Sequence, residues 1–277
     1  MNRKQCTRDL LVSCKSFMIE YKKGIVIPLI SNSIIMGLLI YILHPLVHYE
    51  TSPEHFNQLT GEQVLFFYLG VIAFLFIVHL IAFFFMTVLS AYILETKNNN
   101  KPTLTHSFKI ILKQLHSISL WFLYSSFFGF LSILFRYFIR NFSWYKRWLG
   151  SMNWQMATFL TIPLLTKKFY YPFELIKESR DLMINTWGTP HIQNFGFGGY
   201  VFLGRITAFL PAIIAALIAA KPTLIICVII SSILLILVTS IQVYTNMLIV
   251  CACYESAVNN QETKYFNKKT ISYALKP

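Results

Sequence analysis

The chain has 277 residues, of which 56% are hydrophobic and 13% charged, and its mean hydropathy is +0.57. Soluble proteins carry about 25% charged residues, so this composition excludes an ordinary soluble domain. The net charge of +13 does not indicate a nucleic-acid partner, because the basic residues are divided among short segments between apolar runs, where cytoplasmic retention and anionic lipid headgroups explain them.

Two long apolar runs indicate that lipid surrounds the chain. Residues 63–94 and 222–254 contain no Asp, Glu, Lys or Arg, and about 20 apolar residues are enough to cross a bilayer. We therefore predict an all-α fold, a polytopic transmembrane bundle of about six helices with short amphipathic interfacial helices. Residues 1–277 would form a single integral membrane domain. The predicted spans are about 24–44, 64–94, 115–135, 152–165, 197–219 and 223–254.

The first 23 residues are basic, and residues 8–22 place apolar side chains at helical spacing. This pattern predicts a helix lying in the membrane interface, with a simple basic leader as the alternative. The apolar run that follows is full length and has no small-residue cleavage site, so we expect a retained first span.

The charges in the loop after the first predicted span and in segment 95–114 predict on which side of the membrane each of them lies. Glu50, Glu54 and Glu62 lie in a loop without Lys or Arg, which predicts the outside. Segment 95–114 is rich in lysine and is expected inside. It also contains a second amphipathic pattern, 104–115, with Thr103 or Thr105 as the candidate N-cap.

Residues 115–166 allow two topologies. With six spans, the basic residues Arg136, Arg140, Lys146 and Arg147 lie outside, against the positive-inside preference, with aromatic residues as headgroup anchors. Alternatively, 115–166 forms a re-entrant or half-inserted hairpin, which leaves four full spans. We favour six spans on the sequence alone.

A third amphipathic helix is predicted over 172–187. Pro172 and Glu174 suit a first helical turn, and Gly188 suits a helix end. Ser179, Trp187 and Gly188 are the candidate docking residues of this helix. The lysine-rich tail is expected inside, so both termini are predicted to be cytoplasmic.

Three polar residues lie within the last two apolar runs. Arg205 is the most informative, because a charge at bilayer depth is costly and usually faces protein or water. It is predicted either to contact an anion or headgroup, or to play a structural role by pairing with Asp181, Glu255 or carbonyls or by extending to the membrane interface. Gln242 and Asn246 lie four residues apart on one helix face, so Arg205, Gln242 and Asn246 form the candidate intramembrane polar site.

No catalytic or metal-binding pattern stands out in the sequence. His44, His48 and His55 accompany Glu50 and Glu54, but their irregular spacing does not favour zinc. The five cysteines include no CxxC pair and are predicted to be reduced packing residues. We therefore predict no metal, no cofactor and no enzymatic activity.

The segments RDLLVSCKSFMIEYKKGIVIPLIS, WQMATFLTIPLL, PFELIKESRDLMINTWG and ACYESAVNN are similar to landmarks of a known family. It is an uncharacterised bacterial family of multi-pass membrane proteins, defined only as a domain of unknown function. The resemblance implies a Ser-containing helix before the first span, and a second one that closes in Thr-Trp-Gly. It implies no activity. The matching positions are Ser16, Trp154, Ala157, Thr158, Pro163, Ser179, Thr186, Trp187 and Gly188.

Two functions remain open from the sequence. The first is a non-enzymatic protein of the bacterial inner membrane that organises lipids, through their anionic headgroups, or a membrane-protein partner. The second is a transporter or lipid-translocating protein with a polar path near Arg205, Gln242 and Asn246.

Overall fold

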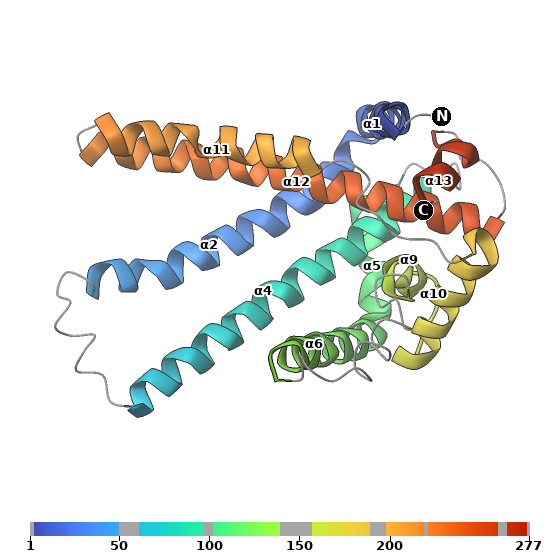
Figure 1. Ribbon diagram of the computed structural model, residues 1–277, viewed down its shortest axis with the longest axis horizontal. Helices are drawn as coiled ribbons and strands as arrows, with labels where there is room; N and C mark the ends of the chain where they lie inside the picture. The colour runs from blue at the N-terminus through green and yellow to red at the C-terminus, as the bar shows by residue number, and fades with distance from the viewer. Residues whose placement is uncertain are drawn as a thin grey trace.

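The computed structural model describes residues 3–49, 61–96, 102–138, 157–188, 198–218, 221–259 and 265–275. All regular secondary structure in these ranges is helical (Figure 1), which confirms the predicted all-α fold. The longer helices are α1 (Arg3–Glu20), α2 (Val26–Tyr49), α4 (Gly61–Glu95), α6 (Leu115–Phe138), α10 (Pro172–Trp187), α11 (Gly198–Ile218) and α12 (Lys221–Asn259). The shorter ones are η1 (Lys22–Ile25), α5 (Leu104–Lys113), α9 (Thr161–Leu165) and α13 (Lys268–Leu275).

Local sequence explains several helix ends. Thr103 caps α5, because its hydroxyl oxygen accepts a hydrogen bond from the His106 amide at 3.3 Å. Pro172 occupies the first turn of α10, where its missing N–H costs nothing. Gly188 ends α10 with a φ of 80°, a conformation that favours glycine.

The buried residues gather at one end of the molecule, which we call the base. Its core contains Phe83–Leu94 of α4 and Tyr244–Tyr254 of α12, packed against α1, α5, α9, α10, α13 and the start of α6. Figure 1 shows these short helices clustered at the right, where both chain ends lie. The base is therefore a helical layer built around the ends of two long helices.

Beyond the base, α2, α4 and the α11–α12 hairpin extend as separate arms that diverge across the left of Figure 1. The core begins at Ile27 in α2, Phe83 in α4 and Tyr244 in α12, leaving about 22 residues on each arm, enough to cross hydrocarbon. Large apolar side chains stay exposed along the arms, among them Ile40, Phe66, Ile72, Leu75, Phe202, Leu203, Ile225 and Ile229.

The described residues contain three helical stretches long and apolar enough to cross a membrane, Lys22–Ile42, Tyr68–Glu95 and Ile225–Asn259. A shorter apolar stretch, Val201–Ala216, lies in α11. These features fit the predicted membrane bundle. The number of spans stays a prediction, because residues 139–156, which bear on the third and fourth spans, lie outside the described residues.

The predicted span 152–165 differs from the structure in its described part. Residues 157–165 form a turn and the short helix α9, and Leu160, Leu164 and Leu165 are buried in the base core. Protein covers these residues, so their apolar character arises from core packing between α4, α10 and α12 rather than from exposure to lipid.

Specific polar contacts join the arms where they approach one another. The Asn32 amide of α2 donates to Ser240 Oγ of α12 at 2.9 Å. Pro211 interrupts the backbone ladder of α11, and the next amide, Ala212 N–H, donates to Ser231 Oγ of α12 at 3.0 Å. Such contacts fix the register of the helices that they join.

Candidate functional site

Arg205 and Gln242 form a hydrogen-bonded pair between α11 and α12. Arg205 Nη2 donates to Gln242 Oε1 at 2.8 Å, and the Arg205 side chain is exposed. Asn246 lies one turn further along α12 and is also exposed. The structure thus joins two of the three residues predicted as a polar site. The partner of Arg205 in this contact is the side-chain carbonyl oxygen of Gln242, not Asp181 or Glu255.

The pair lies where the arms leave the base, not halfway along them. Gln242 is two residues from Tyr244, the first core residue of α12. Tyr244 Oη donates to the backbone oxygen of Tyr21 at 3.0 Å, beside the start of the first candidate span at Lys22.

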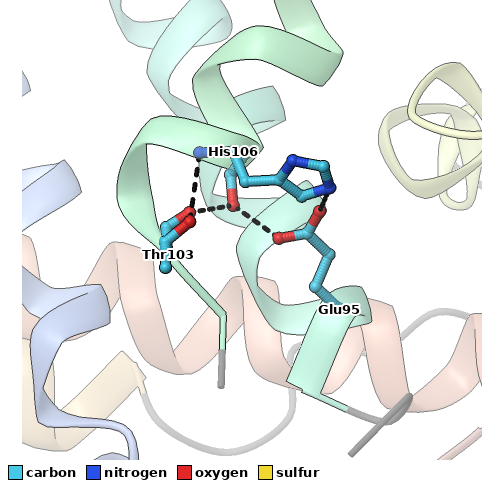
Figure 2. Close-up of polar contacts among 4 residues, drawn as sticks. Glu95, Thr103 and His106 are labelled. Atoms are coloured by element: carbon cyan, nitrogen blue, oxygen red, sulfur yellow. Dashed lines mark hydrogen bonds and ion pairs between the residues drawn. The ribbon is translucent and has the colours of Figure 1, made fainter. Parts of the chain in front are cut away.

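A second polar cluster connects the end of α4 to α5 (Figure 2). Ser107 Oγ lies 3.0 Å from Glu95 Oε2, and His106 Nε2 lies 3.2 Å from Glu95 Oε1. Ser107 and His106 both contact the carboxylate and not each other, so the arrangement is not that of a catalytic triad. Ser107 is fully buried. The cluster therefore attaches α5 to α4 and closes the N-terminus of α5 together with Thr103.

Sequence reasoning offered Thr103 or Thr105 as the cap, of which the structure has Thr103, but it missed the role of Glu95. A signal was present, because Glu95 is the first acid after the apolar run 63–94 and lies twelve residues before Ser107. A carboxylate at the end of a long apolar helix usually finds a partner from the chain that follows, since burial without one is costly.

Helix α10 turns the predicted docking residue Ser179 toward the core. Ser179 is fully buried, and its hydroxyl oxygen accepts a hydrogen bond from the Leu160 amide at 3.2 Å. Trp187 is partly buried against the same core, and Gly188 is exposed. Ser179 therefore holds the segment before α9 in place, and in this conformation a docked partner would not reach it.

The outward face of α10 borders a charged groove of about 570 Å³. Lys168 Nζ lies 3.5 Å from Glu178 Oε2 and 4.5 Å from the centre of the Tyr170 ring. Burial, followed by the hydrogen bond and charge of Glu178, raises the pKa of Tyr170, so its phenol stays protonated in the physiological range. The groove is lined by Lys168, Phe169, Tyr170, Glu174, Lys177, Glu178, Asp181, Leu182 and Asn185.

The cysteines of α1 are packed thiols. Cys14 is completely buried, and burial raises its pKa to about 12. Burial, followed by the charge of Asp9, also raises the pKa of Cys6, whose sulfur donates to the Thr270 carbonyl at 3.6 Å. Both thiols stay protonated near neutral pH and are poor nucleophiles there.

The histidine cluster of the predicted outer loop falls outside the described side chains, which applies to His44, His48 and His55 alike. Within the ranges that the structure describes, no group of three His, Cys, Asp or Glu side chains is arranged to hold a metal ion.

Comparison with known proteins gives one family. A family of unknown function, DUF6159, matches residues 65–264, which confirms the expected resemblance to an uncharacterised family. No curated protein and no solved structure matches the chain.

Proposed function

Because the chain belongs to DUF6159, whose function is unknown, we propose a function from its structure. In this proposal, the chain is a non-enzymatic, multi-pass protein of the bacterial cytoplasmic membrane that organises lipids or membrane-protein partners. The observation that carries this proposal is the division into a packed base and exposed apolar arms. Side chains such as Phe66 (71% exposed) and Ile225 (62% exposed) need lipid or protein around them.

Anionic lipid headgroups are the proposed ligands at the junction of base and arms. Lys22 and Lys23 are exposed at the start of the candidate span Lys22–Ile42, and Arg205 is exposed near the start of the shorter apolar stretch Val201–Ala216. Each basic residue near an anionic surface contributes about 1 kcal/mol of attraction. The Arg205–Gln242 hydrogen bond supports this role, because it holds the guanidinium on the side of the hairpin at that level.

The groove along α10 is the proposed surface for a protein partner. Its acids, Glu174, Glu178 and Asp181, lie along one face of the helix, and the lysines Lys168 and Lys177 lie beside them. This face replaces the one that the sequence suggested, since Ser179 lies on the opposite, buried side. A partner with a mixed-charge helix would complement the groove.

We place the base, with both termini, on the cytoplasmic side. Helices α1 and α13 contact each other through Cys6 and Thr270, so the two ends of the chain share one side. The lysine-rich connections predict that this side is the cytoplasm.

Transport is the alternative function, and one observation bears on it. A path at Arg205 would require its side chain to face a cavity between helices. Arg205 instead lies exposed on α11 and bonds to the neighbouring helix of the same hairpin. This geometry supports a boundary contact more directly than a translocation path.

Purification from native membranes in polymer-bounded lipid discs tests the proposal, with identification of the retained lipids and proteins. We expect enrichment of anionic lipid over the bulk membrane, and a loss of that enrichment in a variant carrying Lys22→Gln, Lys23→Gln and Arg205→Gln. The matched control is Lys109→Gln, because Lys109 is exposed on α5, within the base. Equal lipid composition in all three proteins, with no protein retained, would contradict the proposal. Release of the chain by alkaline carbonate would reject its membrane location.

A further inference from the structure

An exposed patch of large apolar side chains lies on the base, on α6 and the start of α10. It consists of Leu123 and Phe127 of α6 with Tyr171, the N-cap of α10, and Phe173 in the first turn of α10, and we call it the α6–α10 patch. Phe169, which also lines the α10 groove, borders it. Phe173 is 71% exposed and Phe127 is 59% exposed. Large apolar side chains are seldom exposed to water as a contiguous group, so we expect lipid or another protein surface to cover the patch.

The patch is held in one shape by contacts beneath it. Ser117 Oγ donates to the Tyr170 carbonyl at 2.8 Å and accepts from the Tyr170 amide at 3.1 Å, which fixes α6 to the segment before α10. The Tyr124 ring lies 5.2 Å from that of Phe173, and the His116 ring stacks on Phe169 at 5.7 Å. The two helices therefore present their exposed rings as one surface.

The contacts of α6 with α4 show where the patch lies along the axis from base to arms. The Phe122 ring lies 4.7 Å from Phe76, 5.4 Å from His79 and 6.2 Å from Phe83. Phe83 is the point where α4 enters the base core, so α6 crosses α4 at the boundary between base and arm. Figure 1 shows α6 strongly foreshortened where α4 lies in the plane, so the two helices do not run side by side.

The composition of the patch and its surroundings indicates its occupant. Tyr is enriched at headgroup depth, and Phe and Leu are typical of the apolar face of interfacial helices. The exposed Lys167 adds a positive charge two residues from Phe169, whereas Lys168 is paired with Glu178. Buried Ser117, Ile118 and Trp121 face the base, so α6 has one protein-facing and one open apolar side. A helix of this kind suits the plane of an interface.

We propose that the α6–α10 patch lies in the headgroup layer of the same leaflet that the base adjoins, with an anionic lipid surface as its occupant. This inference rests on the proposed membrane function and extends it from the arms to the base. The inference also favours the four-span topology, in which residues 115–166 form a hairpin that does not cross the membrane. Leu115 and Ala157 both belong to the base and would lie on its side of the membrane. The basic residues Arg140 and Lys146 need not cross to the outside.

Photocrosslinking of the full chain in native membranes tests the occupant. Benzoylphenylalanine replaces Phe127 or Phe173, and both positions are exposed, so the substitutions do not disturb the core. Phe66 on the α4 arm is the control for lipid contact, and Asp181, exposed on α10 beside the groove, is the control for water. Lipid adducts are identified by mass spectrometry and dimers by their size on a gel.

We expect Phe127 and Phe173 to form lipid adducts as Phe66 does, with a yield roughly tenfold above that of Asp181. Lipid adducts at Phe66 but not at Phe127 or Phe173 would overturn the inference and leave the proposed membrane function intact. Absence of lipid adducts at all positions, Phe66 included, would overturn both. Crosslinked dimers at Phe127 or Phe173 would show that a second copy of the chain, not lipid, covers the patch.

Discussion

Gly24 of η1 lies directly against the Tyr244 ring of α12, with no room for a side chain between them. A β-carbon at Gly24 would lie 2.8 Å from Tyr244 Cζ and 2.8 Å from Tyr92 Cε1, closer than atoms of this kind approach. Three segments of the chain, η1, α4 and α12, therefore meet at a single small residue. The Tyr244 hydroxyl completes the junction by donating to the Tyr21 carbonyl at 3.0 Å.

We predict that Gly24→Ala lowers the free energy of unfolding by about 1–3 kcal/mol, because the two rings must shift to admit a methyl group. Thermal unfolding in detergent measures the effect. Gly37→Ala is the matched control on α2, where nothing lies within 4 Å, and it should leave stability unchanged or raise it by up to about 1 kcal/mol. Equal midpoints for the two variants would show that the Gly24 junction does not limit stability.

Ser179→Ala should destabilise the base by about 1–3 kcal/mol, because it removes the acceptor of the buried Leu160 amide. Ser16 provides a contrast, since it is exposed and bonds only within its own helix, to the Val12 carbonyl. Ser16→Ala is expected to change stability by less than about 0.5 kcal/mol. Chemical unfolding of both variants distinguishes a core role of Ser179 from a surface role, for which the two costs would be similar.

Ser107→Ala should cost more stability than His106→Ala. Ser107 is fully buried against Glu95, so its loss removes a partner from a carboxylate that is only 16% exposed, at a cost of about 1–3 kcal/mol. His106 is 64% exposed, and its contact with Glu95 should contribute less than about 1 kcal/mol. The reverse order in unfolding experiments would make the histidine, rather than the serine, the main attachment of α5 to α4.

Arg205 and Gln242 should be energetically coupled. A double-mutant cycle with Arg205→Leu and Gln242→Leu is expected to give a coupling of about 0.6 kcal/mol, typical of one hydrogen bond between membrane helices. The corresponding cycle between Arg205 and Asn246 should be additive, because Asn246 lies a turn further along α12. Equal coupling in the two cycles would indicate a shared polar network instead of one bond.

The buried thiol of Cys14 predicts a pH dependence in the alkaline range. Its pKa is raised from about 9 to about 12 in the folded state, so the folded protein retains a proton that the unfolded chain releases. Its contribution to stability is complete below pH 9 and falls as the pH rises toward 12, by at most about 1.4 kcal/mol per pH unit. The measurement is the slope of stability against pH, which should be shallower in Cys14→Ala. Unchanged slopes would contradict the burial of this thiol.

The helices could be predicted from the sequence because their signals are local. The uncharged runs require helices in lipid, and Pro172 with Gly188 marks both ends of α10. The inward face of α10 could not be predicted in the same way. Its apolar stripe suits a membrane surface as well as a protein core, and only the distant partner Leu160 decides between them.

The buried segment at α9 shows the same limit. Leu160, Leu164 and Leu165 have the composition of a lipid-exposed span, yet they lie in the base core. Apolar residues enter protein interiors and hydrocarbon for the same physical reason, so composition does not separate the two environments. Arg205 and Gln242 were each recognised as unusual, but their contact depends on how α11 pairs with α12, which no local signal specifies.

The contrast between base and arms implies two regimes of evolutionary substitution within one chain. Exposed arm positions such as Ile72 and Ile229 need only remain apolar, so substitutions among aliphatic and aromatic residues should have little effect there. Fully enclosed positions such as Leu160 must match their neighbours in volume and shape. Among relatives, the recognisable signature should therefore concentrate in the base, while the arms preserve little beyond their length.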